Sequence, residues 1–393
     1  MFIKRTISTK ILNLSKQYPV VAITGPRQSG KTTLVKQLFP KHLYITLEDL
    51  DLKAKVQFDP RGFLATHGNE YGLIIDEAQE VPELFSYIQG IVDREKKDGF
   101  FILTGSQNFL LYEKITQSLA GRVALFTLLP LSIQELKQAE LVSSLAEEQM
   151  QKGFYPRTYE KNMSDLNFFY MTYIATYIER DVRNVLQISN LTSFQKFMKL
   201  CAARIGNIIN FAELARDCDI DQKTAKAWLS VLEASYIIKL MYPFYNNFSK
   251  RLIKSPKLYF VDIGLACHLL GIRSAQDLFI HESRGALFES MIMMELSKMY
   301  FNQAMIPPLY FWRTTQGQEI DCIIEKSYAL QIPVEIKASV TMQKSFASSI
   351  AQWPVITEKP IEASYVVYAG NQFFGGQGAH FIPWNDLEKM DLF

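Results

Sequence analysis

The chain has 393 residues, of which 48% are hydrophobic and 21% charged, and its formal net charge is +2. At roughly 100–200 residues per domain, this length predicts two or three domains, and the composition excludes a disordered chain. No apolar run approaches the ~18 residues of a membrane span, so we expect no membrane protein. The N-terminus lacks the pattern of a signal peptide, and the four cysteines form no Cys-x-x-Cys pair. We therefore expect a cytoplasmic protein without a zinc site or disulfides.

From about residue 18 to 130, short apolar runs alternate with helical patterns. Five strands with helices between them are typical of a parallel sheet covered on both faces. The predicted strands are Val20–Thr24, Leu43–Leu47, Leu73–Asp76, Phe100–Thr104 and Val123–Leu128.

The first strand runs into a glycine-rich loop. The segment from Gly25 to Thr32 fits G-x-x-x-x-G-K-[ST], and a helix follows from Thr33. Such a loop turns backbone N–H groups toward phosphate oxygens, and the helix N-terminus adds positive charge. Lys31 is expected to reach the β- and γ-phosphates, and Thr32 to ligate Mg²⁺. We predict that the nucleotide is bound by Gly25, Pro26, Arg27, Gln28, Ser29, Gly30, Lys31, Thr32 and Thr33.

The third strand ends in two carboxylates. In Leu73-Ile-Ile-Asp76-Glu77, we expect Asp76 to hold Mg²⁺ through water and Glu77 to orient and deprotonate the attacking water. The alternative is a strand that ends in solvated acids. An acid directly after the Mg²⁺ ligand favours an ATPase that carries its own base over a kinase or a small GTPase.

Polar side chains also follow the fourth strand. Ser106 is our candidate to sense the γ-phosphate, with Gln107 and Asn108 as close alternatives and a simple turn nearly as good an interpretation. Arg122 is a candidate to contact a nucleotide in trans, and a structural surface arginine is the equal alternative.

Residues 18–135 resemble the AAA+ ATPase family, in particular the AAA domain that precedes an uncharacterised C-terminal domain in many bacterial and archaeal proteins. The matching text is GPRQSGKTTL, LIIDEAQ, ILTGSQ, LAGR and LLPLS. The resemblance continues through Gly153–Pro156 and Tyr177–Asp181. At the former, the family usually has Gly-Gly-x-Pro, whereas this chain has Lys152-Gly153. The resemblance implies ATP as the nucleotide and a homo-oligomer, often a ring of six subunits with ATP sites at the interfaces.

The region from about 160 to 280 has mostly helical periodicity. A short helix (Asn210–Cys218), a turn, a second helix (Gln222–Glu233) and a hairpin (Ile237–Tyr242 with Leu258–Val261) resemble a winged helix-turn-helix. The expected hairpin tip carries Lys250, Arg251, Lys254 and Lys257, a wing suited to DNA phosphates. The alternative is a packing module with a solvated wing.

The last region, from about 282, is predicted to contain a long helix, three strands, a second helix and a fourth strand. Glu289 lies on the first helix, Asp321 on the strand Glu319–Glu325, and Glu335 and Lys337 on the strand Ile332–Lys337. Residues two apart project from one face of a strand, and a charge pair in an apolar strand is costly without a role.

This set resembles the PD-(D/E)XK nuclease superfamily. The resemblance implies that Asp321 and Glu335 ligate Mg²⁺ together with the Ile336 carbonyl. It implies that Lys337 orients the attacking water and that Glu289 binds the metal through water. Arg313 is expected either to touch a substrate phosphate or to form a rim ion pair. A nuclease-like fold that has lost cleavage is the alternative.

The predicted architecture is α/β. It comprises an AAA+ P-loop domain over residues 1–150, a helical and winged-helix region over 151–280, and a PD-(D/E)XK-like domain over 281–393. The favoured function is an ATPase that acts on DNA, with ATP and Mg²⁺ as cofactors and a C-terminal domain that binds or cleaves DNA. The alternatives are an ATP-dependent switch or scaffold whose nuclease-like domain binds a protein partner, and a DNA-binding regulator without cleavage.

Overall fold

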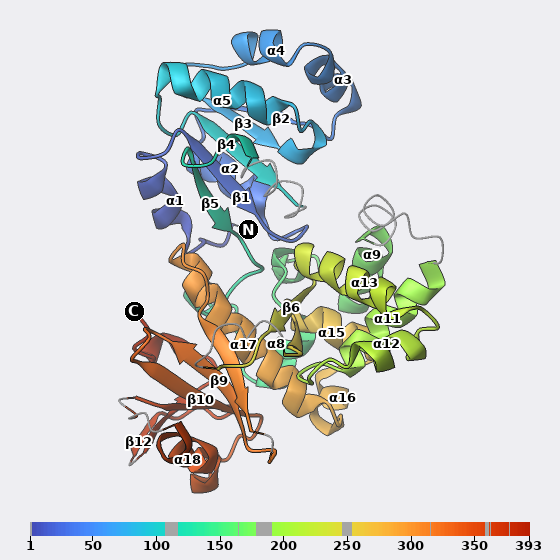
Figure 1. The fold of residues 1–393 in the computed structure, drawn as a ribbon, viewed down its shortest axis with the longest axis vertical. Coiled ribbons are helices and arrows are strands. Elements are labelled where there is room, and N and C mark those ends of the chain that lie inside the picture. Colours follow the sequence, from blue (N-terminus) through green and yellow to red (C-terminus); the bar gives the residue numbers. More distant parts are fainter. Residues whose placement is uncertain are drawn as a thin grey trace. The chain divides into compact units, whose positions relative to one another are not determined.

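The structure is a computed structural model that describes residues 2–106, 117–163, 165–177, 191–245, 254–314, 316–357, 361, 363–376 and 378–393 (Figure 1). Its contacts divide the chain into two compact units. Unit 1 comprises residues 1–131, 234–236 and 299–306, and unit 2 comprises 132–233, 237–298 and 307–393. The boundaries predicted at residues 150 and 280 stay predictions.

Unit 1 contains the five predicted strands in one sheet, in the order β2-β3-β4-β1-β5. Every neighbouring pair is parallel. Because parallel strands end at one edge of a sheet and β4 lies between β1 and β3, the residues after these three strands meet at that edge. The strands are β1 Val20–Thr24, β2 Leu43–Thr46, β3 Leu73–Asp76, β4 Phe101–Gly105 and β5 Val123–Thr127.

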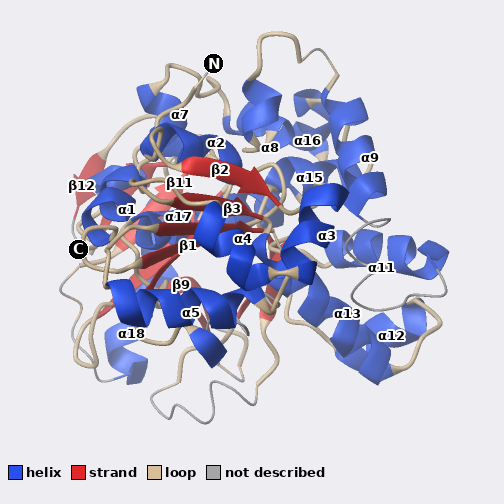
Figure 2. Cartoon of the chain, turned by 90° about the horizontal axis from the view of Figure 1, so that it is seen from above, coloured by secondary structure: helices blue, strands red, loops and turns tan. Residues whose placement is uncertain are grey.

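Helices cover both faces of this sheet, and Figure 2 shows α2 and α5 on opposite sides of the strands. Alternate residues of each strand face opposite sides, which produces two apolar cores. On one face Val21 and Ile23 pack with α1 Ser8–Leu14 and α2 Lys31–Leu38. The other core contains residues of β1, β3 and β4 and of α3 Leu50–Phe58, α4 Pro60–Thr66 and α5 Leu84–Glu95.

Unit 2 begins with a helical region, as the periodicity predicts. Helix α7 starts with a capping box in which Ser132 and Glu135 satisfy each other's backbone N–H groups. The helices of this region are α7 Ile133–Gln138, α8 Ala146–Lys152, α9 Leu166–Tyr177, α11 Leu191–Ala203, α15 Ile263–Leu269 and α16 Ala275–Ile280.

The predicted helix-turn-helix elements are present. They are α12 Phe211–Asp217, α13 Gln222–Ala234 and the antiparallel strands β6 Ile238–Met241 and β7 Lys257–Phe260. On α13, Gln222, Lys223 and Lys226 are exposed, and Ala225, Leu229 and Leu232 are buried. Lys250 and Arg251 lie outside the described residues.

The C-terminal part of unit 2 holds a mixed six-stranded sheet in the order β12-β13-β11-β10-β9-β8. Helix α17 Arg284–Asn302 precedes it, and α18 Ser348–Thr357 lies between β10 and β11 in the chain. The predicted element order is confirmed, whereas β12 and β13 were missed. The strands are β8 Leu309–Arg313, β9 Glu319–Glu325, β10 Gln331–Lys337, β11 Tyr365–Tyr368, β12 Phe374–Gly376 and β13 Ala379–Pro383.

None of the described helices has the length and apolar character that crossing a bilayer requires. The four cysteines all lie within the described residues, where each is buried and free.

The turn at Gly153 keeps a glycine where the conformation demands one. Gly153 follows α8 with φ +72° and ψ −162°, a conformation that L side chains rarely adopt. A Cβ at this position would overlap the hydroxyl of Tyr170, which bonds to Asp262 at 2.8 Å. Asp262 also accepts the Phe154 backbone N–H at 2.7 Å. The turn therefore persists although Lys152 replaces the first glycine of the family pattern.

We expect Gly153→Ala to destabilise unit 2 by about 2–5 kcal/mol, because left-handed strain adds to overpacking. All four tryptophans lie in unit 2, so tryptophan fluorescence in urea reports its unfolding. Gly271→Ala is the matched control: its φ is +78°, but no atom lies within 4 Å of the added Cβ. The control should cost only about 1–2 kcal/mol. Equal losses in the two variants would contradict the steric argument.

Candidate functional site

The predicted phosphate-binding loop joins β1 to α2 in unit 1, and its conformation requires its glycines. Gly25 has φ +148°, and a Cβ there would overlap the Leu128 carbonyl oxygen. Gly30 has φ +92° and is the N-cap of α2. Glycine adopts both conformations without steric cost. The loop therefore leads directly into the N-terminus of α2, as the motif predicts.

Lys31 and Thr32, the first residues of α2, face the interior of the loop region. The Lys31 ammonium donates to the carbonyls of Gly25 and Pro26, at 2.9 Å each. The Thr32 hydroxyl donates to Asp76 Oδ2 at 2.7 Å. Thr32 and Asp76 therefore lie side by side, although 44 residues separate them. Thr33, in contrast, is exposed.

Arg5 forms hydrogen bonds to the phosphate-binding loop, and the sequence did not predict this role. Its buried guanidinium donates to the Ser29 carbonyl at 2.8 Å and to the Leu129 carbonyl at 2.6 Å. A guanidinium presents its donors in a rigid fork, so these bonds fix the loop relative to the segment after β5. No motif marks a single arginine that lies 20 residues before the loop.

Asp76 is a buried carboxylate whose side-chain partners come from helix α2 and from strands β2 and β4. Tyr44 of β2 donates its hydroxyl to Asp76 Oδ2 at 2.8 Å, and Thr104 of β4 donates to Oδ1. Burial, followed by Asp76, raises the pKa of Tyr44 above its ordinary value. The Thr32 and Asp76 oxygens form a hard-oxygen pair that fits the predicted Mg²⁺.

Glu77 is held in place by the residues that follow it and by the end of β4. Its backbone is left-handed, with φ +53°. Its Oε2 atom accepts the Ser106 N–H at 3.1 Å and the Ser106 hydroxyl at 2.9 Å, and Gln79 donates to the same oxygen. The structure thus places Ser106 on Glu77, a contact that the sequence did not reveal. The alternatives Gln107 and Asn108 lie outside the described residues.

The remaining N-terminal candidates, Arg122 and Arg27, each pair with an acidic residue. Arg122 forms a bidentate ion pair with Asp93. Its Nε lies 2.6 Å from Asp93 Oδ1, and its Nη2 lies 3.1 Å from Asp93 Oδ2. Arg27 lies 3.8 Å from Glu48. Tyr236, also in unit 1, has its hydroxyl 2.8 Å from Thr24 Oγ1 at the end of β1.

In unit 2 the predicted carboxylates come together. Asp321 of β9 accepts the Ile336 N–H at 2.7 Å through Oδ2, and the Lys337 ammonium lies 3.7 Å from that oxygen. Lys337 also pairs with Glu335 Oε1 at 2.7 Å. Glu335 and Lys337 therefore project from one face of β10 toward β9, as their spacing predicts.

A second lysine completes this cluster. Lys257 of β7, which we expected on a DNA-facing wing, is instead only 3% exposed. Its ammonium lies 2.9 Å from Glu289 of α17 and pairs with Glu319 of β9. This expectation was wrong because Lys257 already belongs to the strand that packs inside unit 2. The Tyr259 hydroxyl, two residues on, donates to the same Glu289 oxygen at 2.5 Å.

Burial dominates the electrostatics of the cluster. It raises the pKa of Glu289 and of Glu335 to about 7, with the Asp321 charge as the next cause and the lysines opposing. Glu335 Oε2 is buried and has no hydrogen-bond partner among the described residues. An orphaned carboxylate oxygen is costly, so this atom points to a missing ligand.

A metal ion fits the Asp321 and Glu335 side of the cluster. Within the described part of the chain, no three His, Cys, Asp or Glu side chains form a complete metal site. Mg²⁺, however, usually keeps several waters and needs only one or two carboxylates. The unpaired oxygen of Glu335 and the nearby Asp321 supply such a pair.

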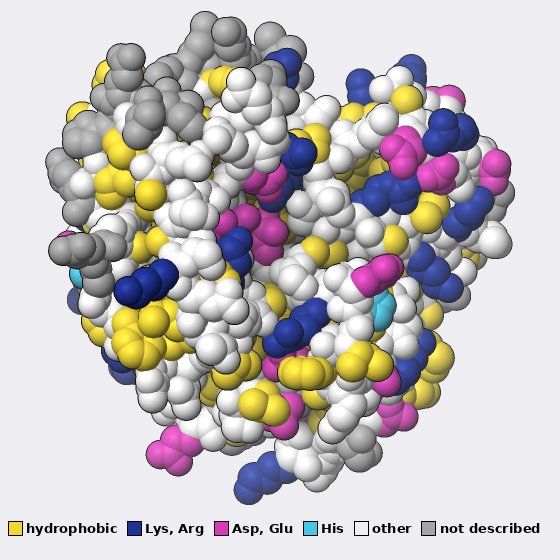
Figure 3. Space-filling model, turned by 90° about the horizontal axis from the view of Figure 1, so that it is seen from below, with side chains coloured by type: hydrophobic (Ala, Val, Ile, Leu, Met, Phe, Trp, Pro, Cys, Tyr) yellow, Lys and Arg dark blue, Asp and Glu magenta, His cyan; other side chains and the backbone are white. Residues whose placement is uncertain are grey.

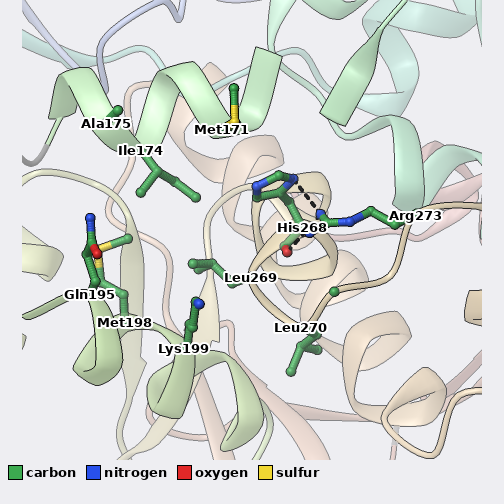
Figure 4. Close-up of a pocket in the computed structure, with 11 residues that line it drawn as sticks. Met171, Ile174, Ala175, Gln195, Met198, Lys199, His268, Leu269, Leu270 and Arg273 are labelled. Atoms are coloured by element: carbon green, nitrogen blue, oxygen red, sulfur yellow. Dashed lines mark hydrogen bonds between the residues drawn. The ribbon is translucent and has the colours of Figure 1, made fainter. Parts of the chain in front are cut away.

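A separate hollow of about 410 Å³ lies among α9, α11 and α15 in unit 2 (Figure 4). Met171, Met198 and Leu269 line it together with His268 and Arg273. Arg273 donates to His268 Nδ1 at 2.8 Å. Burial, then Arg273, then Lys199 lower the pKa of His268 to about 4. No sequence motif falls on this hollow.

In Figure 3 the Lys and Arg side chains are scattered and interspersed with Asp and Glu side chains. Among the described basic residues of the predicted DNA-binding module, Lys223 and Lys226 of α13 and Lys254 before β7 are exposed.

Comparison with known proteins adds three family matches. A family described as an AAA domain matches residues 17–137. Two domains of unknown function, DUF8612 and DUF4143, match residues 143–276 and 284–387.

The chain also resembles whole proteins. The uncharacterized proteins Rv2008c of Mycobacterium tuberculosis and Mb2031c of Mycobacterium bovis are each 31% identical to it over 326 residues, which is 82% of this chain and 71% of theirs. Among solved structures, the Walker-type ATPase PABY2304 of Pyrococcus abyssi gives a TM-score of 0.44 at 15% identity, covering 68% of this chain and 96% of that one.

Proposed function

We propose that this chain, which belongs to the same family as the mycobacterial proteins Rv2008c and Mb2031c, is an ATPase that acts on DNA. Its residues 17–137 form an AAA-type P-loop ATPase domain. The proposal includes a C-terminal domain that is a Mg²⁺-dependent nuclease of the PD-(D/E)XK type. The chain would hydrolyse ATP as a homo-oligomer, in which Arg122 contacts the nucleotide bound by the neighbouring subunit, as the AAA+ resemblance implies.

In ATP hydrolysis, the residues of unit 1 would have separate roles. The loop N–H groups and Lys31 would hold the triphosphate, and Thr32 and Asp76 would hold Mg²⁺, which neutralises phosphate charge when bound. Glu77 would take the proton of the attacking water. Since Ser106 and Gln79 occupy Glu77 Oε2, Glu77 would have to exchange one of these bonds for that water.

The nuclease assignment rests on one observation, the buried and unpartnered Glu335 Oε2 beside Asp321 and Lys337. Glu335 and Asp321 would hold the cation, which supplies a Lewis acid for the phosphate and a bound water. Lys337, one third exposed, would steady the negative charge that develops on the phosphate. Because metal binding requires ionised carboxylates, it should release protons from a cluster whose carboxyl pKa values are raised.

A second function, an ATP-dependent switch whose nuclease-like domain binds a protein partner, is favoured by Lys257. Its ammonium already neutralises part of the carboxylate cluster, as expected of a structural ion network rather than a catalytic one.

DNA cleavage separates the two functions. We expect the wild-type chain with Mg²⁺ or Mn²⁺ to nick or cut DNA, tested as duplex, single-stranded and branched substrates, and the Asp321→Asn/Glu335→Gln variant to lose at least about 10²-fold of this activity. Asp391→Asn is the control, because Asp391 is an exposed acid near the end of the chain. If neither the wild type nor the variant cleaves any substrate while ATP is still hydrolysed, the result contradicts the nuclease proposal and favours the ATP-dependent switch.

A further inference from the structure

We propose that Lys257 is a built-in cation that occupies one side of the carboxylate cluster and limits it to a single divalent metal ion, bound on the Asp321 and Glu335 side. The inference rests on the metal site of the proposed function. It assigns a role to a lysine that the motif pattern does not include.

The first support is where the ammonium lies. Lys257 Nζ is 2.9 Å from Glu289 Oε1 and also pairs with Glu319 Oε1. Both acids thereby have a cation between them, which is the arrangement that a bridging divalent ion would create. Glu289, expected to bind metal through water, therefore has an ammonium as its cationic partner.

The second support is how firmly this ammonium is held. Lys257 is 3% exposed, whereas Lys337 is 33% exposed. Lys257 also lies on β7, whose main chain pairs with β6 along its whole length. Burying a long flexible lysine side chain costs conformational entropy and desolvation energy. This cost indicates that the Lys257 ammonium has a role in the cluster.

The third support is the charge count. The cluster holds four carboxylates, Glu289, Glu319, Asp321 and Glu335, and two lysines, Lys257 and Lys337. Four negative and two positive charges leave a net charge of −2, which one divalent cation neutralises. Arg313, 48% exposed, adds a charge only at the outer edge of Glu319. Metal binding requires all four carboxylates to be ionised. A second divalent cation would then bring the net charge of the cluster to +2 with Lys257 present and to +1 without it, so the Lys257 ammonium makes that second ion markedly less favourable.

The fourth support is the asymmetry of the carboxylates. Glu289 Oε1 has two donors, Lys257 and Tyr259. Glu335 Oε2 has no partner among the described residues. The buried carboxylate oxygen without a donor therefore belongs to Glu335, whereas the Glu289 oxygen that faces Lys257 is already occupied.

The test is the number of Mn²⁺ ions bound by the full chain without nucleotide, measured by the electron paramagnetic resonance of free Mn²⁺. Mn²⁺ bound elsewhere, including at Thr32 and Asp76, is subtracted with a chain in which all four carboxylates of the cluster are replaced by amides (Glu289→Gln, Glu319→Gln, Asp321→Asn and Glu335→Gln). We expect one ion in this cluster for the wild type and two for Lys257→Met, which keeps the apolar stem and removes the charge. Lys257→Arg should keep one ion.

Lys254→Met is the matched control, since Lys254 is exposed and only three residues upstream. It should bind one Mn²⁺, like the wild type. Two ions in the wild type, or one in a folded Lys257→Met chain, would overturn the inference.

Lys257→Met leaves the partly buried acids Glu289 and Glu319 without their cation, which destabilises the metal-free chain. The thermal midpoint of unit 2, followed by tryptophan fluorescence, then provides the readout. Millimolar Mn²⁺ should raise the midpoint of Lys257→Met more than that of the wild type, since two ions rather than one stabilise the folded state. An equal or smaller rise would also overturn the inference. A single bound Mn²⁺ in a wild-type chain that never cleaves DNA would refute the nuclease proposal and leave the role of Lys257 intact.

Discussion

Replacing Lys31 with alanine is expected to lower kcat/KM for ATP by roughly 10²- to 10³-fold, because the variant loses a preorganised positive charge at the transferred phosphate. The Lys31 ammonium bonds to the Gly25 and Pro26 carbonyls inside the loop. It is therefore already placed beside the predicted phosphates, and substrate binding only has to exchange carbonyl oxygens for phosphate oxygens.

The measurement is steady-state ATP hydrolysis together with the binding of a fluorescent ATP analogue. Lys10→Ala is the control, since Lys10 is an exposed lysine of α1 in the same unit. Circular dichroism checks that the Lys31 variant is folded, because the two loop carbonyls lose a donor. ATP turnover at the wild-type rate in a folded Lys31→Ala chain would refute the role of this lysine.

Glu77→Gln is expected to lower the rate of ATP hydrolysis by roughly 10²- to 10⁴-fold while ATP remains bound, because an amide cannot accept the proton of water. The amide oxygen of glutamine can still accept the Ser106 N–H and hydroxyl that now bond to Glu77 Oε2. The substitution should therefore change the chemistry and leave the local structure unchanged.

Single-turnover hydrolysis, measured beside ATP affinity, separates these two effects. Glu80→Gln is the matched control: Glu80 is three residues away and pairs with Lys53 at 2.6 Å, outside the Thr32 and Asp76 cluster. Its rate should stay within about twofold of the wild type. If Glu77→Gln weakens ATP affinity as much as it slows hydrolysis, then Glu77 supports binding and is not the base.

Part of this protein is determined by short stretches of sequence. The loop from Gly25 to Thr32, the strand that ends at Asp76, and the pair Glu335 and Lys337 lie where their spacing predicts. Their geometry is local, because a strand, a glycine turn and a helix start position neighbouring residues by backbone conformation alone. The same reason explains why the five strands of the first sheet and four of the six strands of the second could be predicted.

Only the tertiary structure decided which distant side chains join each site. Arg5 contacts the Leu129 carbonyl across 124 residues, and Lys257 contacts Glu289 across 32 residues. The hydrophobic pattern fixes that β7 is buried, but it does not say which of its polar side chains is buried with it or which acid faces it. Such pairs depend on how whole elements pack, so a lysine that the sequence placed on an exposed wing lies instead in the middle of a carboxylate cluster.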